Sequence, residues 1–430
     1  MTRAKRMHAL AAVTAVSVVV TLSACASDDS ASGSTSGSGN EKVELTLATF
    51  NQFGYDDLIT EYQKLHPNIT IKHKKAATSN EARDNLNTRL AAGSGLSDIE
   101  AIEVDWLPEL MQYSSKFNDL GSAEVKDRWL DWKAAAATDQ KGRLIGYGTD
   151  SGPEAICYRS DLFKKAGLPT DREKVAELLG SSWDSYFAAG KKFKAASKVP
   201  WFDSIGATYQ GMVNQVETTY ENKGDNTVIA TTNPEVRRLY DTVVKAGIDD
   251  GLSAHLQQWS DDWAASFQKD GFATMLCPGW MLGVIEGNAK GVKGWDVANT
   301  FPGGGGNWGG SYLTVPTQSK HAKEAKALAA WLTAPEQQIK AFKAVGAFPS
   351  QQAALTSPEL ASVKNPFFAN APTGTIFAER AKAVTVTPYK GPKYFPVNDA
   401  MQQALTRVED KSMTPEKSWE RFVNDVKALG

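Results

Sequence analysis

Apolar and polar residues follow two different periods along the first part of the chain. Residues 43–47 alternate with a period of two, which is typical of a half-buried strand, and residues 69–71 resume that pattern. Between and after them, apolar residues recur at helical spacing over 55–65 and 80–92. A further apolar run at 99–104 predicts another strand. Strands and helices therefore alternate from the start of the folded region.

The same alternation returns in the second half. A strand is predicted at 155–159, followed by a helix to Ala166, and a long helix begins at Trp183. Later helices are predicted at about 234–246, 261–269, 322–332, 335–344 and 415–429. Such alternation indicates an α/β protein in which mostly parallel sheets carry helices on both faces. With this length, we expect two lobes rather than one core.

The N-terminus has the pattern of a secretory signal. Arg3, Lys5 and Arg6 precede an apolar run of about 13 residues, shorter than the roughly 20 that a membrane-spanning helix needs. Leu22-Ser23-Ala24-Cys25 follows and resembles the lipobox of bacterial lipoproteins. We therefore expect residues 1–24 to be a lipoprotein signal peptide and Cys25 to be lipidated. Residues 25–42, rich in serine and glycine, are predicted to be a flexible tether.

Charge and composition narrow the function. Without residues 1–24, 44 basic and 49 acidic residues remain, so no basic surface for nucleic acid is expected. The glycine run 303–306 lacks the lysine of a phosphate-binding loop, and no spacing of His, Cys or carboxylates indicates a metal site. We expect no cofactor, no metal, and contact with the membrane only through the lipid.

Two cysteines remain after Cys25. Cys157 and Cys277 each lie in a strand-like apolar run. They could be two small buried apolar side chains. In an oxidising compartment an even pair favours a disulfide, which would join two strands of one lobe.

Six segments stand out in order along the chain: 45–51 (LTLATFN), 62–69 (YQKLHPNI), 91–99 (AAGSGLSDI), 156–163 (ICYRSDLF), 275–280 (MLCPGW) and 346–350 (GAFPS). Together they resemble the extracellular solute-binding proteins of carbohydrate ABC importers, the family that includes maltose-binding protein. Ser97 stands where the family usually has proline. Two further segments, 49–55 and 104–108, are closer to actinobacterial cello-oligosaccharide-binding lipoproteins.

The resemblance implies a two-lobed fold of the periplasmic-binding-protein type in which the chain crosses between lobes three times. Lobe one would comprise 43–152 plus 298–345, and lobe two 153–297 plus 346–430. It also implies a monomer without enzymatic activity on the outer face of the cytoplasmic membrane. Such a protein would capture a cellobiose- or cellotriose-type sugar between its lobes and deliver it to permease subunits with a separate ATPase.

A sugar-binding cleft needs flat aromatic side chains for the C–H faces of the rings and polar side chains for the hydroxyl groups. Trp280 follows a predicted strand end, where open α/β sheets bind ligands, and Trp308 lies in a glycine-rich loop. By resemblance, Phe53, Trp106, Tyr209 and Tyr394 are further aromatic candidates.

The polar candidates lie at or just beyond predicted strand ends or in the resembling segments. Each could equally be a turn residue or a helix cap, and a lone lysine could simply be solvated. They are Asn51, Asn80, Glu103, Asp105, Asp150 and Lys390.

Two alternatives remain open. A secreted carbohydrate hydrolase would use two carboxylates, and the same fold could bind another oligosaccharide or a peptide. A serine nucleophile at Ser151 is not supported, because only His255 of the five histidines is a plausible partner. We therefore predict no catalytic residue.

Overall fold

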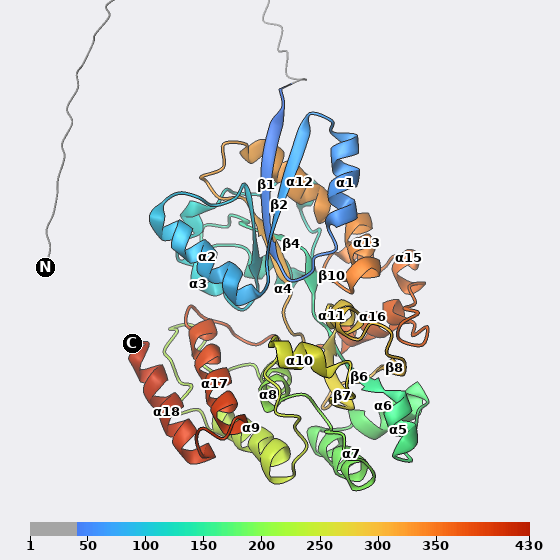
Figure 1. The fold of residues 1–430 in the computed structure, drawn as a ribbon. Helices are drawn as coiled ribbons and strands as arrows, with labels where there is room; N and C mark the ends of the chain where they lie inside the picture. The colour runs from blue at the N-terminus through green and yellow to red at the C-terminus, as the bar shows by residue number, and fades with distance from the viewer. Residues whose placement is uncertain (1–40) are drawn as a thin grey trace, which may run out of the picture. The chain divides into compact units, whose positions relative to one another are not determined.

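Two main β-sheets and a small two-stranded sheet organise residues 41–430, the part of the chain that this computed structural model describes (Figure 1). The predicted signal peptide, Cys25 and the tether as far as residue 40 lie outside the described residues. Residues Lys42–Gly430 form one structural unit. Within residues 41–430, no helix combines the length and the apolar character needed to cross a bilayer.

The first sheet has five strands in the order β2-β1-β3-β9-β4. The first three pair in parallel, whereas β9 runs antiparallel to both of its neighbours. Leu45 and Leu47 of β1 are fully buried and Glu44 is exposed, as the period of two predicts. The strands are β1 (Val43–Phe50), β2 (Ile69–Ala76), β3 (Ile99–Glu103), β4 (Tyr147–Gly148) and β9 (Ser311–Thr314).

Helices on this sheet bury their apolar sides in one cluster with the strands. Thr78 caps the N-terminus of α2 by accepting from the Glu81 backbone N–H, and Gly93 ends it in the left-handed conformation. The helices whose residues join or pack against this cluster are α1 (Asp56–Leu65), α2 (Ser79–Ala92), α3 (Leu107–Met111), α4 (Asp131–Ala136) and α12 (Ala322–Leu332), with the 3-10 turn at Ala123–Val125. A second 3-10 turn, at Ser114–Lys116, lies outside the cluster.

The second sheet corrects one prediction. Its central strand β6 (Glu154–Arg159) is antiparallel to both β7 (Thr274–Pro278) and β8 (Trp295–Ala298), whereas a mostly parallel sheet was expected. Helix α11 (Met281–Asn288) does return the chain from β7 to β8 in the same direction. However, β6 lies between these two strands and runs the other way. The alternation of elements does not reveal this insertion.

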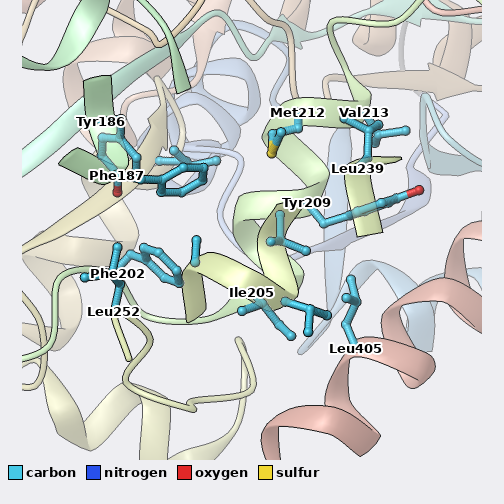
Figure 2. Packing of buried hydrophobic residues seen from close by; sticks show 14 of the residues in the cluster. Tyr186, Phe187, Phe202, Ile205, Tyr209, Met212, Val213, Leu239, Leu252 and Leu405 are labelled. Carbon is cyan, nitrogen blue, oxygen red and sulfur yellow. The ribbon is translucent and has the colours of Figure 1, made fainter. Parts of the chain in front are cut away.

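Two apolar clusters cover the two faces of the second sheet. Ile156 and Tyr158 belong to one cluster, and Ala155 and Cys157 belong to the other, as strand alternation requires. Figure 2 shows the packing of the first of these clusters around Ile205 and Tyr209. The remaining helices are α5 (Ser160–Lys165), α6 (Arg172–Gly180), α7 (Trp183–Ala196), α8 (Ile205–Val213), α9 (Pro234–Val244), α10 (Asp261–Ser266), α13 (Pro335–Val345), α14 (Gln352–Leu355), α15 (Pro358–Ala361), α16 (Thr373–Ala383), α17 (Tyr394–Glu409) and α18 (Pro415–Ala428), with a π-helical turn at Lys245–Asp249.

The predicted disulfide is confirmed. Cys157 of β6 is bonded to Cys277 of β7, with 5.4 Å between their Cα atoms. Residues 157 and 277 lie diagonally across the antiparallel pair, since Cys157 is opposite Met275 and Cys277 opposite Ala155. The bond therefore joins two strands of one sheet across 120 residues of chain.

The chain passes between the sheets in three places, which lie side by side. Strand β5 (Asp150–Ser151) leads from the first sheet to the second and pairs with β10 (Phe348–Pro349). The stretch from β8 back to β9 is bonded to the first passage, because Trp308 N–H donates to the Gly152 carbonyl at 2.8 Å. A Cβ at Gly152 would lie 1.7 Å from the Trp308 carbonyl oxygen, so only glycine fits there.

Glu154 is a buried carboxyl at one of these passages. It is 0% exposed and neither carboxyl oxygen has a hydrogen-bond partner among the described residues. Burial raises the pKa of Glu154 to about 8, and the nearby Asn214 and Lys390 offset only part of that effect. The folded protein therefore keeps this carboxyl protonated at neutral pH.

We expect Glu154→Gln to remove a pH dependence of stability. In the wild type, the stability associated with this raised pKa is fully present below about 4.5 and is lost as the pH rises to about 8, a change of roughly 3–5 kcal/mol. The measurement is the free energy of unfolding in denaturant at pH 5 and pH 8. The variant should gain stability over the wild type at pH 8 more than at pH 5.

Glu44→Gln is the matched control, because Glu44 is an exposed residue of β1 in a surface ion pair with Lys72. It should follow the wild-type pH profile. A Glu154→Gln profile parallel to the wild type would contradict the assignment.

Candidate functional site

A cavity of about 610 Å³ lies between the two sheets and is lined by residues from both sides. The first side contributes the residues that follow β1, the start of α2 and the end of β3. The second side contributes α8, the loop before α10, the start of α11 and α17. The carboxyl ends of β1 and β3 thus open into it, as expected for ligand sites of open α/β sheets.

The structure brings most of the predicted site residues together at this cavity. Those that line it are Asn51, Phe53, Asn80, Glu103, Asp105, Asp150, Trp280 and Trp308. Asn51 has a positive φ of 47°, a conformation that asparagine tolerates better than most residues. Its backbone N–H still donates to Ala76, so the turn into the cavity begins directly at the end of the paired strand.

Tryptophan side chains form a group on one wall. The Trp280 indole N–H donates to the Trp308 carbonyl at 2.9 Å, and the two rings meet edge to face with centroids 5.7 Å apart. This bond fixes the orientation of Trp280 because its one polar atom is already engaged. Both side chains are half-buried, so ring surface remains available to a ligand.

Trp259 extends this group and was not predicted. Its ring is stacked on Trp280 with centroids 6.0 Å apart, and it is 41% exposed. Its φ of 72° is unusual for a large side chain and turns the chain just before Ser260 caps α10. One feature of the sequence could have identified Trp259 as a candidate, because this aromatic residue directly precedes Ser260, the N-cap of α10.

Three predicted aromatic residues are not at the cavity surface. Trp106 is fully buried and donates its indole N–H to Ser79, which itself lines the cavity. The hydroxyl groups of Tyr209 and Tyr220 are hydrogen-bonded to each other inside the apolar cluster of Figure 2. Tyr394 is 1% exposed. Their rings are used in packing behind the wall, so the structure does not support direct stacking of a ligand on them.

A network of amide groups on α8 and α17 was also missed. Asn398 donates to Gln210 at 2.9 Å and accepts from Tyr220 at 3.0 Å. Both amides line the cavity. Because helical periodicity indicates only which face of a helix is apolar, it does not identify these polar residues as cavity residues.

Acidic groups lie at the end of β3. The Asp105 backbone N–H donates to Glu103 at 2.9 Å. Burial, together with the charge of Asp105, raises the pKa of Glu103 well above its ordinary value. Lys390 forms an ion pair with Asp105 in which both side chains are 10% exposed. Lys390 is therefore neither solvated nor on the wall of this cavity.

Lys390 instead lines a second cavity, of about 600 Å³, together with Trp132 and Tyr389. Most residues around this second cavity are apolar. Within residues 41–430, no group of three His, Cys, Asp or Glu side chains is placed to hold a metal ion.

Two sheets with helices, three passages between them and an aromatic, polar cavity in between define a two-lobed α/β binding protein. A family model of bacterial extracellular solute-binding proteins matches residues 57–369. The chain belongs to this family, which confirms the resemblance and the fold class predicted from the sequence.

Known relatives agree with this assignment. The chain is 28% identical over 367 residues to an arabinooligosaccharide-binding protein of Bacillus subtilis (strain 168), covering 80% of each chain. A crystal structure described as an extracellular solute-binding protein of family 1 is 52% identical, with a TM-score of 0.79 over 90% of this chain and 99% of that one. The binding protein of B. animalis subsp. lactis Bl-04, in complex with β-1,6-galactobiose, is 20% identical with a TM-score of 0.78 over 91% and 97% of the two chains, and supports the fold alone.

Proposed function

We propose that this protein captures an oligosaccharide in the cavity between its lobes and delivers it to an ABC importer. The observation that carries the proposal is the cavity itself, which is lined by tryptophans together with carboxyl and amide groups. Aromatic faces suit the C–H surfaces of sugar rings, and carboxylates and amides suit hydroxyl groups. The family and the named substrates of its relatives support the same class of ligand.

Contacts between the lobes explain how binding would change the conformation. Asp105 at the end of β3 pairs with Lys390, which precedes α17, and Arg83 of α2 lies over the ring of Phe395 at 4.5 Å. A ligand that contacts both sides favours the closed arrangement over an open one. The permeases would then recognise the closed form, and a separate ATPase would supply the energy.

The attachment to the cell is part of the proposal. Lipidation at Cys25 with a serine- and glycine-rich tether would keep a monomeric binding unit at the outer face of the cytoplasmic membrane. This arrangement places the cavity where external sugars arrive.

Different observations favour two different sugars as the ligand, a cello-oligosaccharide and an arabinooligosaccharide. The segments 49–55 and 104–108 favour a cello-oligosaccharide, whereas the named curated relatives bind arabinooligosaccharides. Calorimetric titration of residues 42–430 with cellotriose, arabinotriose, xylotriose and β-1,6-galactobiose distinguishes them. We expect one-to-one binding of cellotriose. Binding of another panel sugar alone would discard the cello-oligosaccharide assignment, and binding of none would contradict the oligosaccharide proposal.

The hydrolase alternative has its own readout. If the protein released new reducing ends from cellotriose, the binding-only proposal would be wrong.

A further inference from the structure

The acidic or basic side chains that line the cavity between the lobes are all carboxylic acids. They are Glu103, Asp105, Asp150, Asp399 and Glu409. In the part of the chain that the structure describes, the lining includes no lysine, arginine or histidine. A ligand in this cavity therefore meets oxygen atoms and aromatic rings, with no cationic side chain on the wall.

Two ammonium groups, those of Lys390 and Lys133, lie behind the wall. Lys390 is occupied by its ion pair with Asp105. Lys133 is 0% exposed, and its Nζ lies 4.0 Å from the ring centroid of Tyr312 and has no hydrogen-bond partner among the described residues. A Cβ at Gly310, a residue of the cavity wall, would come within 2.8 Å of that Nζ. The backbone at Gly310 thus packs directly against Lys133, which is itself not part of the lining.

This arrangement balances the buried charge without offering a cation to the ligand. Lys133 interacts electrostatically with Asp150 and Glu103, which favours its charged form. Burial has the larger effect and lowers the pKa of Lys133 to about 8. Asp150 accepts from Thr149 at 2.7 Å and from the Ser311 backbone N–H at 2.9 Å, which holds it in place. A sugar hydroxyl can donate to such a carboxylate. A ligand carboxylate would find no cationic side chain on the wall and would face Asp150 and Asp399, and juxtaposed like charges cost several kcal/mol.

We propose that the cavity selects uncharged oligosaccharides and rejects those that carry a uronic acid. This inference rests on the proposed function and specifies its substrate class. The expected discrimination is at least about 100-fold in affinity between a neutral sugar and the corresponding uronate.

The test uses three matched ligands with residues 42–430 at pH 7. They are the panel sugar that binds most tightly, the same sugar with one terminal primary hydroxyl group oxidised to a carboxylic acid, and the methyl ester of that acid. If xylotriose is the tightest, xylobiose carrying a terminal glucuronic acid and its methyl ester replace the oxidised pair. Calorimetry should give binding at least about 100-fold weaker for the acid than for the parent, and binding of the ester within about tenfold of the parent.

Two results would overturn the inference while leaving the proposed function intact. One is an acid that binds within tenfold of the parent. The other is an ester as weak as the acid, since the discrimination would then be steric. Failure of every panel sugar would instead remove the proposed function, and this inference with it.

A pair of charge-reversing variants tests whether the discrimination against the acid arises at the cavity wall. Asp399 of α17 lines the cavity, whereas Asp410 at the end of the same helix is exposed and does not. Asp399→Lys should improve the affinity of the acid at least tenfold relative to the parent sugar. Asp410→Lys makes the same change in net charge and should leave that ratio unchanged. An equal change in both variants would assign the discrimination to net charge rather than to the wall.

Discussion

Replacement of Cys157 and Cys277 by alanine is expected to lower the free energy of unfolding by about 3–5 kcal/mol. The bond closes a loop of 120 residues of sequence separation, and loops of that length lose the most conformational entropy when they are cross-linked. It also joins β6 to β7 in a sheet of only three strands. Equilibrium unfolding of residues 42–430 in denaturant gives the value.

The wild type in a reducing agent is the control for this measurement. It should approach the stability of the double variant, because residues 42–430 contain only these two cysteines. Native protein should also show no titratable thiol. A loss of less than about 1 kcal/mol would mean that the strands hold their arrangement without the bond.

Trp280→Ala is expected to weaken oligosaccharide affinity at least tenfold while the fold survives. The indole is fixed by its hydrogen bond to Trp308, and Trp259 is stacked on it. The substitution therefore removes the middle ring of the three tryptophans at the cavity. Buried aromatic anchors of this kind commonly contribute 2 kcal/mol or more to binding, and about 1.4 kcal/mol already gives tenfold. Calorimetry on the variant with the best panel sugar measures the change, and circular dichroism checks the fold.

Trp132→Ala is the matched control for this substitution. Trp132 is a half-buried tryptophan on α4 that lines the second cavity and not the first. Its removal should leave the affinity within about twofold of the wild type. The reverse pattern, with a loss in Trp132→Ala and none in Trp280→Ala, would move the binding site to the second cavity.

Much of the fold could be predicted because local signals agreed with the tertiary structure. The helix expected at 80–92 is α2, and it ends at Gly93 as the sequence indicates. The period of two in β1 matches its buried and exposed residues. The direction of β6 could not be predicted, because the order of strands in a sheet depends on contacts distant in sequence.

The candidate site was predictable where a residue follows a strand end, as Asn51, Glu103 and Trp280 do. Position along the chain does not, however, distinguish the surface of a cavity from the layer behind it. Trp106 and Tyr209 lie close to cavity residues in sequence, yet their rings are fully buried. Trp259 was missed because its position at the cavity depends on a left-handed backbone conformation at Trp259 itself. The sequence pattern does not predict that conformation.

We propose that an oligosaccharide binds between the lobes against Trp259, Trp280 and Trp308. The most direct measurement is the panel titration carried out in parallel on wild-type residues 42–430 and on Trp280→Ala. We expect one-to-one binding of one panel sugar to the wild type and at least tenfold weaker binding to the variant. Binding of no panel sugar, or equal binding to the two proteins, would contradict it.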